Sequence, residues 1–132
     1  MAQAKLLNKG FAMEVELIKT FRFAAAHSLS HLPAEHKCSG MHGHSYRVDI
    51  HVAGPLPEGS GWLMDFADLK AITTPVINTL DHANLNEIPG LEISTSEMIA
   101  KYIWEKIKPR LPLLAAVAIW ESETSRCIYR GK

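Results

Sequence analysis

Two histidines on one short stretch are the residues of this chain best placed to do chemistry together. His42 and His44 flank Gly43 at the start of a run, 42–52, in which polar and apolar residues alternate, and such alternation predicts a β-strand. Side chains two apart on a strand share a face, with Cα atoms about 7 Å apart, so both imidazoles can reach one metal ion. Gly43 leaves the opposite face open to close neighbouring backbone. The same pair also fits chance placement on a half-buried strand.

A second predicted strand offers a third histidine. Residues 21–27 alternate so that His27 shares a face with Phe21 and Phe23. The loop 28–41 would let this strand pair with 42–52 and bring His27 beside the other two histidines. Three neutral imidazoles plus water are a common catalytic zinc arrangement, because the fourth position stays open for substrate. The spacing therefore predicts a Zn²⁺ site whose ligands are His27, His42 and His44.

A cysteine lies close to this predicted metal site. Cys38 precedes His42 by four residues and follows Lys37, and a nearby cation favours the thiolate form of a cysteine. We therefore expect a reactive thiol, although a small buried hydrophobe is the alternative. His31 and His36 lie in the same loop, and the sequence assigns no role to them or to Cys127.

Acidic residues stand at the ends of two further predicted elements. Asp81 adjoins His82 where a helix should end, which suggests an oriented proton carrier; alternatively, His82 only favours the carbonyl end of the helix dipole. Glu121 shares a strand face with apolar residues, which is costly unless it has a partner. Its carboxylate could accept two parallel N–H bonds from the edge of an amidine-like heterocycle, or it could emerge into solvent.

The elements that must position these residues follow from periodicity and capping signals. Asp65 should cap a helix that Pro75 kinks or divides, and Ser94 and Glu97 match the capping box of a second helix. Lys19 interrupts the apolar face of the first strand, at a bulge or an edge. Strands are predicted at 14–26, 42–52, 62–66 and 113–123.

Composition sets the broad class. With 132 residues, the chain suits one domain, 14–132, preceded by an N-terminal extension, 1–13. The 14 basic and 14 acidic residues balance, so nothing suggests electrostatic binding to nucleic acid. No apolar run is long enough to span a bilayer, and no targeting segment is evident, so we expect no membrane partner and a cytoplasmic protein. Free thiols are then favoured over a disulfide.

Taken together and in order, these motifs resemble the 6-pyruvoyltetrahydropterin synthase family over residues 21–132. The matching motifs are His27, Cys38-x-x-x-His42-Gly-His44, Trp62-Leu-Met-Asp-Phe66, Leu80-Asp-His82, Thr95-Ser-Glu97, Glu121 and the ending Cys127-Ile-Tyr-Arg-Gly131. The resemblance implies an α+β tunnelling fold (T-fold), a four-stranded antiparallel sheet with two helices on one face. Subunits of such proteins join their sheets into a β-barrel, usually as trimers that stack in pairs, so a homohexamer with active sites at subunit interfaces is expected.

The resemblance also implies a role for each candidate residue. Zinc would be bound by His27, His42 and His44, Cys38 would be the catalytic thiol, and Asp81 and His82 would form the catalytic proton-transferring pair, which could serve a neighbour's zinc. The pterin ring would be anchored by Glu121 with help from Thr95 and Ser96.

The expected activity is that of a zinc-dependent lyase in queuosine (7-deazaguanine) biosynthesis. Its small-molecule substrate would be 7,8-dihydroneopterin triphosphate, and its products 6-carboxy-5,6,7,8-tetrahydropterin, acetaldehyde and triphosphate. The three-residue gap between Cys38 and His42 favours this activity, since the animal family members have a longer gap. The alternatives are elimination of triphosphate without side-chain cleavage, giving a 6-pyruvoyl product, and a zinc- or pterin-binding module without catalysis.

Overall fold

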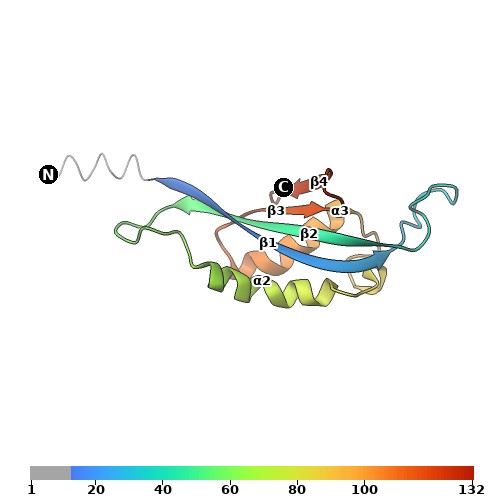
Figure 1. The fold of residues 1–132 in the computed structure, drawn as a ribbon, viewed down its shortest axis with the longest axis horizontal. Coiled ribbons are helices and arrows are strands. Elements are labelled where there is room, and N and C mark those ends of the chain that lie inside the picture. Colours follow the sequence, from blue (N-terminus) through green and yellow to red (C-terminus); the bar gives the residue numbers. More distant parts are fainter. Residues whose placement is uncertain (1–12) are drawn as a thin grey trace.

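One antiparallel sheet forms the framework of the chain (Figure 1). The computed structural model describes residues 13–132, so the predicted extension at 1–13 lies almost wholly outside the described residues. The strands lie in the sheet in chain order, with each one antiparallel to the next. They are β1 (Glu14–His27), β2 (His42–Pro55), β3 (Leu114–Trp120) and β4 (Arg126–Tyr129).

Two α-helices pack against the sheet, α2 (Phe66–Leu80) beside β1 and α3 (Ser96–Ile107) beside β3 and β4. Short 3₁₀ helices follow each of them, η1 (Leu85–Glu87) and η2 (Lys108–Arg110). Alternate residues of β2, such as Val48 and Ile50, are buried with Leu69 of α2 and Ile103 of α3 in a single core. Both helices therefore cover the same face, as the sequence resemblance implied. Among the described residues, no helix is both long and apolar enough to cross a bilayer.

The helix starts depend on capping side chains. Asp65 accepts a hydrogen bond from the backbone N–H of Ala67 at 2.8 Å, which confirms its prediction as the cap of α2. Pro75 lies within α2 without dividing it. The cap of α3 is Thr95, whose hydroxyl accepts from the N–H of Met98. The prediction of Ser94 as this cap was therefore wrong by one residue.

The strand predicted at 62–66 was also wrong. Gly59 and Gly61 have φ of 80° and 75°, a left-handed conformation that interrupts extended backbone, and the segment leads into α2 with Trp62 58% exposed. The fourth strand is β4 instead, in which Cys127 and Tyr129 are half-buried while Arg126 is exposed. Lys19 marks an edge and not a bulge, because β1 is the edge strand and its register with β2 is unbroken.

Candidate metal centre and active site

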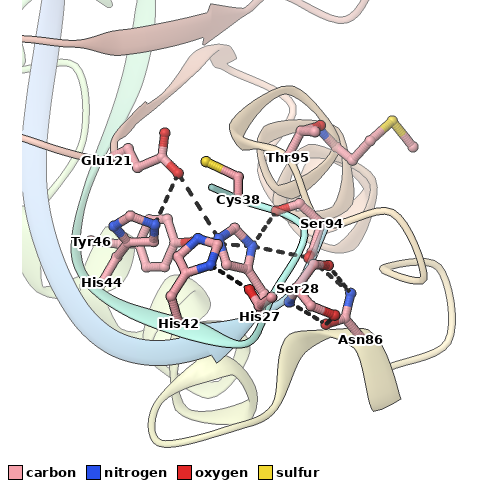
Figure 2. Close-up of polar contacts among 12 residues, drawn as sticks. His27, Ser28, Cys38, His42, His44, Tyr46, Asn86, Ser94, Thr95 and Glu121 are labelled. Atoms are coloured by element: carbon pink, nitrogen blue, oxygen red, sulfur yellow. Dashed lines mark hydrogen bonds and ion pairs between the residues drawn. The ribbon is translucent and has the colours of Figure 1, made fainter. Parts of the chain in front are cut away.

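The three predicted zinc ligands lie together where β1 ends and β2 begins. His27 is paired directly with His42 across the two strands, and His44 is paired with Ala25, two residues before His27. This register puts all three imidazoles on the face that carries the helices. One nitrogen from each ring lies within 4.8 Å of the other two, and Figure 2 shows the rings converging.

Hydrogen bonds to backbone carbonyls set the tautomers of two of the rings. His27 Nδ1 lies 2.8 Å from the carbonyl oxygen of Ser94, and His42 Nδ1 lies 2.8 Å from that of Gly40. A carbonyl oxygen can only accept, so each Nδ1 carries the proton and each Nε2 presents a lone pair. This is the arrangement in which histidine ligates a metal through one nitrogen and donates from the other.

The remaining nitrogens fit a metal ion well. His42 Nε2 and His44 Nε2 are buried and have no hydrogen-bond partner, whereas buried polar atoms in proteins nearly always have one. Three imidazole nitrogens with no other protein ligand form the donor set of an open catalytic zinc site. The residues present therefore fit a divalent metal such as zinc, with a position left for substrate.

The electrostatic surroundings of His27 favour its neutral form. Burial lowers the pKa of His27, and the neighbouring His42 and His44 lower it further, against the opposing effects of the Ser94 carbonyl and Glu121. The neutral imidazole is the form that binds a metal. Tyr46 lies against the cluster, since its hydroxyl is 3.4 Å from His27 Nε2, and burial raises the pKa of its phenol.

Glu121 lies beside this cluster, immediately after β3. Its Oε1 is 3.2 Å from His44 Nε2 and 4.0 Å from His27 Nε2, and the side chain is 40% exposed. The same residue lines an open depression of about 390 Å³ together with Ser96, Cys127 and others. The Glu121 carboxylate therefore lies between the histidine cluster and the depression. Thr95, the other predicted anchor, uses its hydroxyl to cap α3.

Cys38 is a half-buried free cysteine in the loop between β1 and β2. Its carbonyl accepts a hydrogen bond from the N–H of Leu29 at 2.9 Å, which ties it to the chain two residues after His27. Its own N–H donates to His36 Nδ1 at 3.1 Å. His36, to which the sequence assigned no role, thus holds the backbone of Cys38, and Figure 2 draws the thiol in the same close-up as the histidines.

Asp81 and His82 face each other at the outer edge of β1. Asp81 Oδ1 lies 3.1 Å from His82 Nδ1 and accepts from the N–H of Ala24 at 3.0 Å. The Ala24 N–H and then His82 hold the pKa of Asp81 below its usual range. His82 is 84% exposed and has a φ of 60°, a conformation uncommon outside glycine. No hydrogen bond or ion pair joins this pair to the histidine cluster within residues 13–132.

Several residues at the site were not predicted from the sequence. Ser94 and Asn86 contact His27 or its neighbours through side-chain hydrogen bonds that span 8 to 67 residues of sequence. Tyr46 shares the strand parity of His42 and His44, so alternation could have indicated it. A lone asparagine in a loop, by contrast, carries no periodicity.

The fold and this cluster define a class, a tunnelling-fold protein with a candidate metal centre between its first two strands. Residues 16–132 match the family described as 6-pyruvoyl tetrahydropterin synthase, and the chain belongs to that family.

Similar proteins in the family carry two different names. A 6-carboxy-5,6,7,8-tetrahydropterin synthase of Synechocystis is 41% identical over 119 residues, which cover 86% of this chain and 91% of that protein. The human 6-pyruvoyl tetrahydrobiopterin synthase is 30% identical over 139 residues, covering 93% and 96%. The structure of the 6-pyruvoyl tetrahydropterin synthase of Caenorhabditis elegans superposes with a TM-score of 0.83 at 31% identity, covering 92% of this chain and 98% of that one. Membership of this family supports the conclusion that the chain is an enzyme, a tetrahydropterin synthase.

Proposed function

We propose that this chain is a zinc-dependent 6-carboxy-5,6,7,8-tetrahydropterin synthase. It would convert 7,8-dihydroneopterin triphosphate and water to 6-carboxy-5,6,7,8-tetrahydropterin, acetaldehyde and triphosphate, and so belong to queuosine biosynthesis. The observation that carries the proposal is the triple-histidine cluster beside Glu121, in which the Nε2 atoms of His42 and His44 have no hydrogen-bond partner. The relative named for this activity, at 41% identity over most of both chains, supports the choice of product.

The metal would be held by His27, His42 and His44, and when bound it supplies Lewis-acid polarisation of the substrate's side-chain oxygens. Glu121 would bind the amino-pyrimidinone edge of the pterin by accepting its N–H groups, as two charge-assisted hydrogen bonds of fixed direction. Ser96 lines the same depression and would contact the ring beside Glu121, with Thr95 next to it.

Proton transfer would be divided between two groups. Cys38, as thiolate, would take a proton from the side-chain carbon next to the ring, at a position where its backbone is held by Leu29 and His36. His82, oriented by Asp81 at 3.1 Å, would move protons as triphosphate leaves and the carbon–carbon bond breaks. The lowered pKa of Asp81 favours its carboxylate form, which can accept from His82 Nδ1 and so orient the ring.

Asp81 and His82 would serve the histidine cluster of a second copy of the chain. Asp81 and His82 are both hydrogen-bonded to the backbone of Ala24 at the sheet edge, where they face outward. A sheet whose outer strands are β1 and β4 has edges that favour pairing with another chain, and closure into a barrel removes those edges. We propose a trimer built in this way, with two trimers stacked as a homohexamer.

The test is anaerobic incubation of the purified, zinc-loaded protein with 7,8-dihydroneopterin triphosphate, with the products identified by mass spectrometry. We expect 6-carboxytetrahydropterin and acetaldehyde in equal amounts. A 6-pyruvoyl product without acetaldehyde would instead assign the second candidate function, which the similarity to the human and Caenorhabditis elegans proteins supports. Absence of turnover with zinc and pterin both bound would leave a binding module and contradict the proposal.

A further inference from the structure

The side-chain amide of Asn86 is held in one orientation by the backbone around it. Its Nδ2 lies 3.1 Å from the carbonyl oxygens of Ser28 and Glu92 and from Ser94 Oγ, while its Oδ1 accepts from the N–H of Ser28 at 2.8 Å. Carbonyls only accept and a backbone N–H only donates, so the flipped amide would face the wrong partners. Asn86 thereby ties the residue after His27 to the segment before α3.

Ser94 connects this amide to the imidazole. It is fully buried, and its carbonyl oxygen and its Oγ lie 2.8 Å and 3.0 Å from His27 Nδ1. The same Oγ receives the contact from Asn86 Nδ2. Figure 2 shows the chain of contacts running from Asn86 through Ser94 to His27, on the side of the ring away from Glu121.

The backbone places Asn86 with little freedom. Asn84 caps the 3₁₀ helix η1 by accepting from the N–H of Asn86, and it forms a parallel bridge with Ala26. The N–H of Ala26 donates to the carbonyl of Ala83 at 3.0 Å. The turn that carries Asn86 is therefore attached to the edge of β1 one residue before His27.

We infer that Asn86 and Ser94 are positioning residues for the metal centre, which hold the His27 ring in the tautomer and orientation that present Nε2 to the ion. The inference rests on the proposed metal centre and goes beyond its three ligands. Ser94 offers Nδ1 two acceptors, its carbonyl oxygen and its hydroxyl, and the hydroxyl is the atom through which Asn86 restrains the ring, so losing the hydroxyl or the Asn86 amide leaves the ring less firmly oriented. Substitution of such partners of a metal-bound histidine typically weakens metal affinity about 10- to 100-fold.

Two variants and one matched control test this inference. Asn86→Asp keeps the shape and the Oδ1 bond to Ser28 but turns an oxygen toward two carbonyls, and Ser94→Ala removes only the hydroxyl. Thr79→Ala is the control, since it removes a hydroxyl of α2 that is exposed, bonds only to the carbonyl of Val76 and makes no contact with His27, Asn86 or Ser94. Each protein is stripped of metal, its melting temperature is measured, and Zn²⁺ is titrated against a chromophoric chelator. The visible spectrum of the Co²⁺ form reports ligand geometry.

We expect zinc affinity about tenfold below that of the wild type in Asn86→Asp and Ser94→Ala, with an altered Co²⁺ spectrum, and neither change in Thr79→Ala. If Asn86→Asp does not fold, the zinc affinity and Co²⁺ spectrum of Ser94→Ala alone test the inference. Wild-type affinity and spectrum in Ser94→Ala would overturn the inference, as would an equal loss in the Thr79→Ala control. A wild-type protein that binds no stoichiometric zinc would overturn the metal centre itself, and the inference with it.

Discussion

Replacing the carboxylate of Glu121 with the amide of glutamine should separate pterin binding from metal binding. Oε1 lies 3.2 Å from His44 Nε2, and the side chain also lines the depression that contains Ser96. A carboxylate there can accept two N–H bonds from a pterin edge. Glutamine can accept one and must turn its own N–H toward a second donor. The substitution therefore removes one charge-assisted bond and leaves two donors facing each other.

The expected cost follows from these lost contacts. A hydrogen bond to a charged group contributes about 1.5–3 kcal/mol, and an unsatisfied donor adds a penalty of about 1 kcal/mol or more when it is covered. We expect Glu121→Gln to lose about 2–4 kcal/mol of transition-state stabilisation, which is roughly a 30- to 800-fold fall in kcat/KM. Most of it should be seen in KM, since the ring edge is bound in the ground state as well.

The assay is steady-state turnover of dihydroneopterin triphosphate together with zinc content by elemental analysis. Glu123→Gln is the matched control, because Glu123 is exposed in the turn just after Glu121. We expect Glu121→Gln to keep its zinc and Glu123→Gln to match the wild type. A kcat/KM of Glu121→Gln within about threefold of the wild type, or an equal loss in the control, would refute the anchoring role. Loss of zinc together with activity would show that the carboxylate serves the metal cluster.

Three further predictions concern the ligands, the proton carriers and the sheet. His42→Ala should lose the metal, because it removes one of three ligands, whereas His51→Ala should keep it, because His51 lies on the opposite face of β2 and contacts Glu16; elemental analysis that finds zinc in both would refute the ligand set. Cys38→Ala and His82→Ala should each keep zinc and lose at least about 100-fold in kcat. If Asp81 and His82 act on the cluster of a neighbouring subunit, oligomers assembled from both variants should regain turnover, and mixed oligomers as inactive as the two parent variants would contradict an active site shared between subunits. Asp49→Asn should lower the free energy of unfolding by about 2 kcal/mol in urea titrations, because the buried carboxylate accepts from Thr20, Arg47 and Trp120. The pKa of Asp49 is lowered in the fold, since hydrogen bonds from these residues outweigh the opposing effect of burial. The stabilisation by this carboxylate is therefore complete above its unfolded pKa of about 3.8 and is lost as pH falls toward the folded pKa. An Asp49→Asn variant whose stability matches that of the wild type at every pH from the unfolded pKa down to the folded pKa would contradict the assignment.

Most of what could be predicted from the sequence came from the alternation of polar and apolar residues along the strands. His42 and His44 share parity, and His51 does not, and the strand register places them accordingly. The period of a strand fixes the face of each side chain once one face is buried. The loop between β1 and β2 is long enough for the two strands to pair, and the observed register brings His27 opposite His42.

Local signals failed where a distant partner decided the outcome. Ser94 and Glu97 match a capping box, yet the Ser94 hydroxyl contacts His27, 67 residues away in sequence, and Thr95 caps α3. A hydroxyl makes few hydrogen bonds, so a buried imidazole competes directly with the helix end for it. The strand β4 was missed for a similar reason. Four residues give too little periodicity, and their pairing with β3 and packing on α3 stabilise them.

The same strand geometry argues that one chain does not complete the proposed active site. β1 points His27 to the helix-covered face, whereas its outer edge holds Asp81 through the Ala24 N–H and His82 through the Ala24 carbonyl. Turning the Asp81 carboxylate toward the cluster of its own chain would break its bond to the Ala24 N–H, and the backbone bond of His82 to the Ala24 carbonyl fixes its Cα at the outer edge. An exposed pair fixed at a sheet edge is instead suited to act on whatever docks against that edge. Because the edge is a strand, a second copy that extends the sheet would bring its own groups to His82, and this favours catalysis at a subunit interface.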